Sequence, residues 1–106
     1  MGSAVTPTFK RRIMDQKVRR NSGAMFFAEI SNPVPNSSLK ISWFINGEKV
    51  SRDVSKRFVT KFEPKNGRAI LTIADCTIHD EGEVKCVVDN QHDVAECSSS
   101  LKVAVE

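Results

Sequence analysis

The residue types that most often carry chemistry here are three cysteines and two histidines, and their spacing does not build a metal site. Cys76, Cys86 and Cys97 lie ten and eleven residues apart, whereas zinc ligands come in short pairs such as C-x2-C. His79 and His92 stand beside turn residues and have no metal-ligand spacing to each other. We therefore expect no bound metal, and we interpret both histidines as exposed loop residues.

Catalytic motifs are also missing from the sequence. It contains no G-x-S-x-G elbow, no glycine-rich phosphate loop and no H-E-x-x-H, and its five glycines are scattered through expected turns. Asp80 has no predicted nucleophile or base beside it. The run Ser98-Ser99-Ser100 fits a strand with small polar outward residues as well as it fits a phosphorylation site. We expect neither enzymatic activity nor a cofactor.

Positive charge is concentrated near the start of the chain. The net charge is +3, but residues 10–20 alone carry +5, so the rest of the chain is slightly acidic. Such an excess can attract actin, an acidic protein segment or an anionic lipid, or it can simply protect an edge strand from aggregation. The segment has no aromatic side chain, which argues against single-stranded nucleic acid. The candidate partner-binding strip consists of Lys10, Arg11, Arg12, Lys17, Arg19 and Arg20.

Alternation of apolar and polar residues dominates the chain and predicts strands. Asn46-Gly47 is the strongest hairpin signal, because both residues tolerate the positive φ of a type I′ turn. One or two strands near Pro7 and Val18 precede the main set. Seven or more short strands without a long helix indicate a two-sheet sandwich or a barrel. The expected strands cover residues 24–30, 39–45, 48–50, 57–62, 68–73 and 84–88, with a long last strand ending at 105.

The size and composition fit a single domain. The chain has 106 residues, of which 40% are hydrophobic and 27% charged, as in ordinary globular domains. No stretch approaches the ~18 apolar residues that a membrane helix needs. We expect residues 1–6 to be a cloning scar or a linker and residues 7–106 to form the domain.

A set of residues, in order along positions 7–105, resembles the I-set of the immunoglobulin superfamily. Trp43 lies mid-strand, fifteen residues after Ala28, which stands where the family has its first core cysteine. The family motif L-x-I appears at Leu71, and D-x-G-x-Y-x-C appears from Asp80 to Cys86 except at the tyrosine. The resemblance implies an all-β fold, a two-sheet antiparallel immunoglobulin-like sandwich, with the core signature Ala28, Trp43, Leu71, Asp80, Gly82 and Cys86.

The chain departs from the family pattern at three positions. Ala28 replaces a cysteine, so the resemblance implies that Cys86 is a buried free thiol without a partner across the sheets. Val84 replaces the corner tyrosine, whose hydroxyl pins the preceding turn in the family. Asp93 stands where glycine is common, which leaves the type of the last turn open. We expect Asp80 to pair with Arg57 and to brace the turn.

In lacking the inter-sheet disulfide, the chain is similar to domains of titin, twitchin, obscurin and myosin-binding protein C, which are giant cytoplasmic proteins of the sarcomere. The resemblance implies a structural and protein–protein interaction module of a tandem-domain scaffold, acting as a load-bearing spacer and docking surface beside neighbouring immunoglobulin or fibronectin-type domains. It implies a cytoplasmic location in the myofibril.

Two alternatives stay open at this point. The domain binds actin or another acidic partner through its basic strip, or it is an extracellular cell-adhesion domain. The odd number of cysteines favours a reducing compartment, and the single N-x-[ST] acceptor, Asn36, gives the extracellular alternative little support. We therefore expect all three thiols to be free, although spacing leaves open whether Cys76 and Cys97 approach each other.

Overall fold

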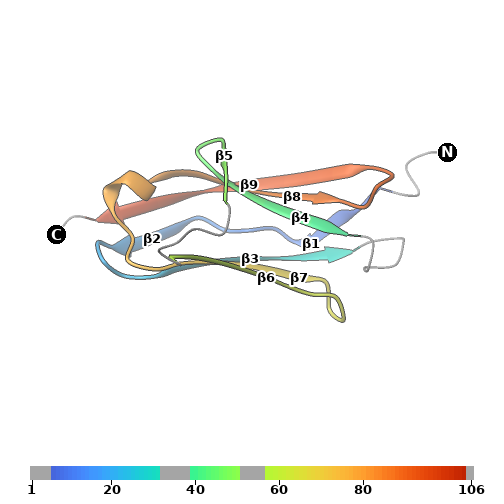
Figure 1. The fold of residues 1–106 in the computed structure, drawn as a ribbon, viewed down its shortest axis with the longest axis horizontal. Helices are drawn as coiled ribbons and strands as arrows, with labels where there is room; N and C mark the ends of the chain where they lie inside the picture. Colours follow the sequence, from blue (N-terminus) through green and yellow to red (C-terminus); the bar gives the residue numbers. More distant parts are fainter. Residues whose placement is uncertain (1–5, 32–38, 51–56, 105–106) are drawn as a thin grey trace.

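Two β-sheets pack face to face in the computed structural model, which describes residues 6–31, 39–50 and 57–104 (Figure 1). The first sheet has the strand order β1-β3-β7-β6 and the second has the order β2-β9-β8-β4-β5. The predicted all-β sandwich is confirmed. The elements are β1 (Thr8–Arg11), β2 (Gln16–Arg19), β3 (Ala24–Ser31), β4 (Lys40–Ile45), β5 (Glu48–Lys49), β6 (Phe58–Glu63), β7 (Arg68–Ile73), the 3-10 turn η3 (Ile78–Asp80), β8 (Gly82–Asp89) and β9 (Val94–Ala104). The predicted acceptor Asn36 and the expected strand end at Val105 lie outside the described residues.

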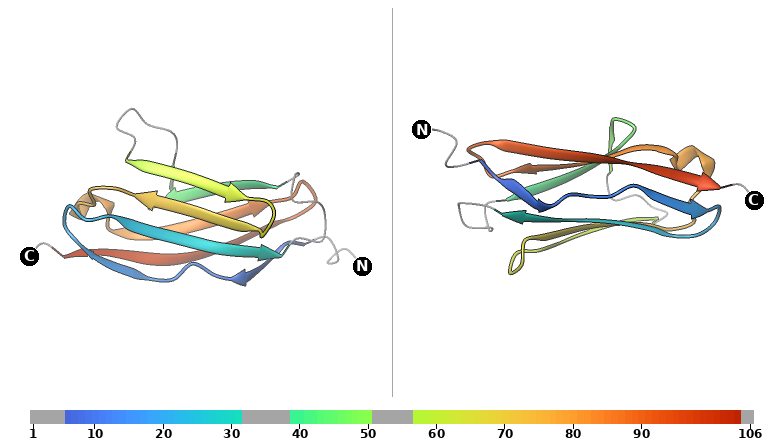
Figure 2. Two further views of the ribbon diagram at one scale, coloured as in Figure 1. Left: turned by 90° about the horizontal axis from the view of Figure 1, so that it is seen from below. Right: turned by 180° about the vertical axis from the view of Figure 1, so that it is seen from behind.

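The N-terminal region contributes one strand to each sheet. β1 pairs with β3 in antiparallel fashion, and β2 pairs with β9 in parallel. Residues 12–15 cross between the sheets (Figure 2), with Ile13 buried in the core and Asp15 Oδ1 accepting a hydrogen bond from Ser100 N–H (2.9 Å). Because the chain does not reverse between β1 and β2, β2 runs in the same direction as the last strand. The β2–β9 pair therefore departs from the expected antiparallel arrangement.

Alternation of buried and less buried residues places one face of the strands β3, β7 and β8 inside the sandwich. In β3, every second residue from Ala24 to Ile30 is buried, and the exposed or half-buried residues between them face outward. Ala28 is the cross-strand partner of Ala69 in the first sheet, and Trp43 is the partner of Cys86 in the second. All four belong to the same buried cluster, so the indole supplies bulk that the small residues leave unfilled between the sheets.

The corner before β8 is held without the family's tyrosine. Val84 is buried and has no hydroxyl, but the side chain of Asn46, from the β4–β5 turn, hydrogen-bonds to the backbone at this corner. Its Nδ2 donates to the carbonyl of Glu81 (2.8 Å), and its Oδ1 accepts from the N–H of Glu83 (3.0 Å). Gly82 lies between these two residues at φ +140°, and a Cβ there would be 1.8 Å from Asn46 Oδ1. The absence of a side chain at position 82 is thus what admits the Asn46 amide.

The structure shows how the turn between β8 and β9, which contains Asp93, is formed. The Oδ1 atom of buried Asn90 accepts hydrogen bonds from the N–H groups of His92 (2.9 Å) and Asp93 (2.8 Å). Gln91 supplies the positive φ of the turn, at 75°. Thr6 Oγ1 donates to Asp93 Oδ2 (2.6 Å), so a residue that we expected to belong to a scar or linker hydrogen-bonds to the β8–β9 turn.

We predict that Trp43→Ala unfolds the domain or lowers its free energy of unfolding by about 3–5 kcal/mol, as large-to-small core changes do. The reason is that the indole is 2% exposed and lies in the central cluster. Chemical denaturation monitored by circular dichroism measures the change. Val59→Ala, at an exposed position of β6, is the control and is expected to stay within about 0.5 kcal/mol of wild type. A Trp43→Ala protein with the wild-type midpoint would contradict the core assignment.

Candidate functional site

The structure divides the candidate basic strip between the two sheets. Lys10 and Arg11 are on β1, whereas Lys17 and Arg19 are on β2, and all of them are exposed. Arg12 lies in the crossing segment and Arg20 follows β2 directly. Figure 2 shows β1 and β2 in opposite halves of the long axis. The strip of residues 10–20 is therefore not one surface: one group lies at β1, a second lies at β2, and Arg12 lies between them.

The group on β1 is partly neutralised by a neighbouring carboxylate. Glu29 lies opposite Arg11 in the β1–β3 ladder, with 4.0 Å between Arg11 Nε and Glu29 Oε1. Arg68 Nη2 donates to the other carboxylate oxygen at 3.1 Å, and its guanidinium lies 5.6 Å from the ring centre of Phe27. The hydrogen bond from Arg68, supported by the charge of Arg11 and Lys10, lowers the pKa of Glu29. Arg11 and Arg68 therefore already share a counter-charge in this part of the surface.

The group on β2 is extended by a residue that sequence reasoning missed. Lys102 is the cross-strand partner of Lys17 in the parallel β2–β9 ladder. The alternate pair Val18–Val103 points inward, so the two lysines point outward and are exposed. Only the strand register could have found Lys102, because it lies far away in the sequence. We call the resulting set, Lys17, Arg19, Arg20 and Lys102, the β2–β9 cationic cluster.

The β2–β9 cationic cluster has no internal counter-charge. None of its four side chains makes an ion pair within residues 6–31, 39–50 and 57–104. Two carboxylates hydrogen-bond to the backbone of β9 and form no ion pair with the cluster: Glu81 Oε2 accepts from Val103 N–H (3.0 Å) and Asp15 Oδ1 accepts from Ser100 N–H (2.9 Å). The cluster can therefore bind negative charge from outside, in contrast to the group on β1.

The signature residues taken from the family pattern lie in the core or in the brace of the turn before β8. Ala28, Trp43, Leu71 and Cys86 are buried side chains of the core. Asp80 is 8% exposed and accepts hydrogen bonds from Arg57 Nη2 and from the N–H of Thr77, so the expected Arg57–Asp80 pair is present. Together with the Thr77 hydroxyl, which caps η3, this arrangement braces the turn before β8.

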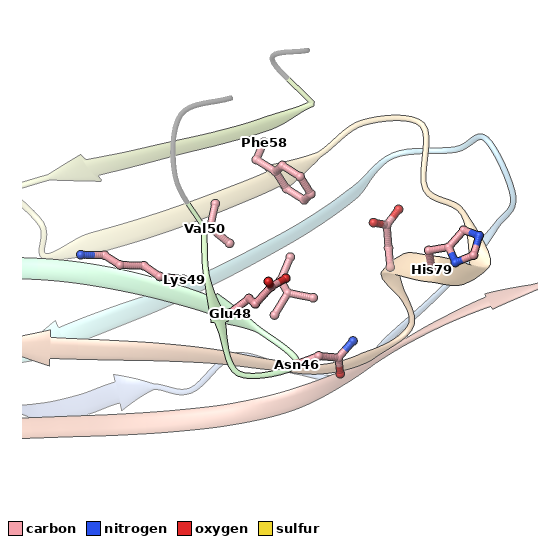
Figure 3. A pocket seen from close by; sticks show the side chains of 8 residues that line it. Asn46, Glu48, Lys49, Val50, Phe58 and His79 are labelled. Atoms are coloured by element: carbon pink, nitrogen blue, oxygen red, sulfur yellow. The ribbon is translucent and has the colours of Figure 1, made fainter. Parts of the chain in front are cut away.

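An open groove lies beside this brace. It is lined by residues of the β4–β5 hairpin together with Phe58, His79 and Asp80 (Figure 3). His79 and His92 are exposed, as expected. No three potential metal-ligating side chains gather anywhere in the described part of the chain. None of the helical segments described is long and apolar enough to cross a membrane.

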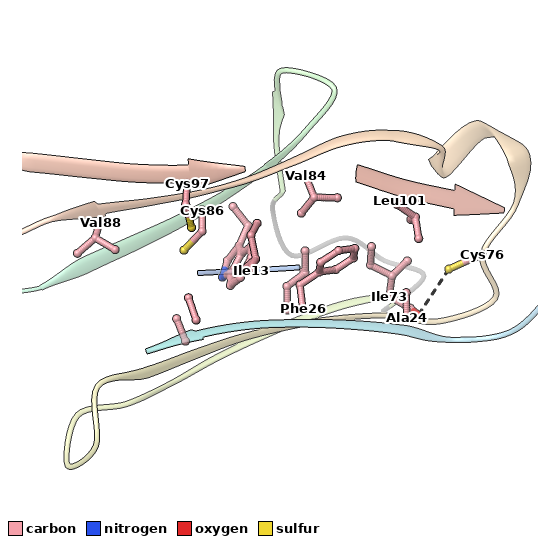
Figure 4. Close-up of a cluster of buried hydrophobic side chains, with 14 of the residues drawn as sticks. Ile13, Ala24, Phe26, Ile73, Cys76, Val84, Cys86, Val88, Cys97 and Leu101 are labelled. Carbon is pink, nitrogen blue, oxygen red and sulfur yellow. Dashed lines mark hydrogen bonds between the residues drawn. The ribbon is translucent and has the colours of Figure 1, made fainter. Parts of the chain in front are cut away.

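The three cysteines occupy two places in the core. Cys86 and Cys97 are direct cross-strand partners in the β8–β9 ladder, whereas Cys76 lies near η3, toward the other end of the core (Figure 4). Cys76 and Cys97 are thus not brought together. All three thiols are free and buried, and Cys76 Sγ donates to the carbonyl of Ile73 at 3.9 Å. Burial raises the pKa of each thiol, with the Cys97 sulfur adding to the effect on Cys86.

We predict that all three thiols react with a thiol reagent in denaturant without reductant, but only slowly in the native domain. A raised pKa keeps the thiolate, which is the reactive form, scarce at pH 7, and its fraction grows as the pH rises toward that pKa. Thiol counting in both states measures this. Thermal melts with and without reductant should coincide, whereas fewer than three thiols and a melting temperature lowered by reductant would reveal a disulfide.

Comparisons with known proteins agree with this architecture. The family profile described as immunoglobulin I-set domain matches residues 7–103. The chain is 39% identical over 66 residues, 62% of its length, to "Muscle M-line assembly protein unc-89" of Caenorhabditis elegans, and 30% identical over 99 residues, 92% of its length, to "Titin" of Drosophila melanogaster. It spans about 1% or less of the length of these relatives.

A solved structure shows the same fold. "Crystal structure of the Titin M10-Obscurin like 1 Ig complex in space group P1" includes a chain that matches with a TM-score of 0.81 at 17% identity, covering 94% of this chain and 95% of that chain. At this identity the match speaks for the fold alone. The family profile, however, covers nearly the whole length of the chain. This chain belongs to the immunoglobulin I-set domain family.

Proposed function

We propose that this domain is a structural and protein–protein interaction module of a tandem-domain sarcomeric scaffold protein, acting as a load-bearing spacer and a docking surface. The observation that carries the proposal is the parallel pairing of β2 with the last strand, β9. The muscle proteins named among the relatives support the sarcomeric location, in the cytoplasm and on the myofibril. The proposal assigns the domain no enzymatic activity and no cofactor.

The shape and topology suit a spacer under tension. The molecule measures 51 × 24 × 22 Å, and β1 begins near one end of the long axis while β9 finishes near the other (Figure 1). A force applied between the chain ends pulls β2 and β9 in opposite directions along the strand axes. Hydrogen bonds between the two strands are then loaded together in shear. Mechanical resistance comes from this ladder and needs no side-chain chemistry.

We predict that Val18→Pro lowers the unfolding force when the domain is pulled by its ends. Val18 pairs with Val103 in the β2–β9 ladder, and proline neither donates a ladder hydrogen bond nor fits the middle of a paired strand. Single-molecule force spectroscopy measures the effect. The control is Glu48→Pro in β5, a short edge strand outside the loaded pair, which should leave the unfolding force near the wild-type value. Equal losses in the two variants would overturn the load-bearing role of β2–β9.

The sarcomeric location has its own test. A fluorescently tagged domain expressed in striated muscle cells should concentrate in a periodic band of the myofibril, because a docking module is retained by its partner. The Trp43→Ala variant, with its disrupted core, serves as the control and should be diffuse. Uniform distribution of the wild-type domain would contradict sarcomeric docking, and would leave the mechanical result unaffected.

A further inference from the structure

We propose that the β2–β9 cationic cluster binds an acidic protein segment in extended conformation, with Asp or Glu at alternate positions. The inference rests on the docking role proposed above and names the surface and the chemistry of its partner. No sequence motif indicates this surface, because Lys102 lies beside Lys17 only through the register of β2 and β9.

The spacing of the cluster matches an extended peptide. Lys17 and Arg19 stand two residues apart on the outward side of β2, which corresponds to about 6.6–6.8 Å along a strand. Lys102 lies on the adjacent strand, about 4.8 Å to the side of Lys17. Carboxylates at alternate positions of an extended segment repeat at the same distance along its axis. One face of such a segment can therefore meet Lys17 and Arg19 in register while Lys102 contacts it from the side.

The cross-strand pairing of Lys17 with Lys102 makes the surface without a bound partner less stable. Like charges directly opposite each other on neighbouring strands are destabilising, and an incoming carboxylate relieves that repulsion. Some other cations of the two sheets have counter-charges: Lys85 Nζ lies 4.0 Å from Glu96 Oε2, and Arg68 Nη2 lies 3.1 Å from Glu29 Oε2. Glu83, on the neighbouring strand β8, makes no ion pair with Lys102.

The same geometry favours a protein segment over other anionic partners. The cluster contains no aromatic side chain on which a base could stack, so single-stranded nucleic acid would have only charge contacts. A lipid surface responds to local positive charge whatever its arrangement. The backbone ladder, by contrast, holds these cations at strand spacing, which is an advantage only for a ligand with the same repeat.

The first experiment measures binding of a fluorescein-labelled peptide of alternating Glu and Ser by fluorescence anisotropy. Lys17→Glu should weaken binding by roughly tenfold, because it removes one cation and places a carboxylate beside Lys102. The same substitution should raise the melting temperature, because it replaces a like-charge pair by an opposite-charge pair. Weaker binding together with higher stability excludes unfolding as the cause.

Lys61→Glu is the matched control, since Lys61 is exposed on β6 of the other sheet and the substitution changes the net charge equally. It should bind the peptide within about twofold of wild type at physiological ionic strength, where charges more than about 8 Å away are screened. An equal loss in Lys61→Glu would overturn the proposal, because only net charge would then matter.

Two further probes separate the partner classes. A peptide of the same composition with its Glu residues in one block should bind more weakly than the alternating peptide, and equal affinity would overturn the spacing argument. Vesicles of phosphatidylcholine with phosphatidylserine should bind more weakly than the alternating peptide, and stronger binding to them would replace the protein partner by a membrane surface. Failure of peptide binding would leave the unfolding-force and localisation results standing, so the two proposals are tested separately.

Discussion

Packing between the two sheets, without a covalent link, is the constraint on which the rest of this structure depends. The family's inter-sheet disulfide typically adds about 2–4 kcal/mol, and Ala28 in place of its first cysteine removes that contribution. The inward faces of β3, β7, β4 and β8 must then pack closely enough to hold the two sheets together without a covalent bond. The buried indole of Trp43 and the small residues of the first sheet belong to one cluster in which the three thiols serve as apolar side chains.

Much of the fold followed from the sequence because period-2 alternation is a local property. Ala24, Phe26 and Ile30 share a face by spacing alone, and the structure buries each of them. The Asn46-Gly47 hairpin and the predicted strand over 68–73 were likewise readable, and both are present. The parallel β2–β9 pair was missed, because pairing between the start and the end of a chain leaves no local signal.

The candidate surface was predictable only in part, for a related reason. The concentration of positive charge in the sequence indicated residues 10–20 as a binding strip, but it could not show that the chain changes sheets within this segment. Ile13 turns inward at the crossing and separates Arg11 from Lys17 in space. The contribution of Lys102 and the neutralisation by Glu29 depend on strand register and on contacts between distant residues. Linear charge patterns therefore identify a region, and topology selects the residues.

The contact between Asn46 and Gly82 couples two positions that lie far apart in the sequence. A side chain at 82 would occupy the place of the Asn46 amide, and a smaller residue at 46 would release the Glu81 and Glu83 backbone groups that the amide satisfies. Substitutions at positions 46 and 82 are therefore not independent of each other. In homologous domains that keep this corner, asparagine at the first position and glycine at the second should be inherited together, and domains that hold the corner with a tyrosine hydroxyl should be released from the rule.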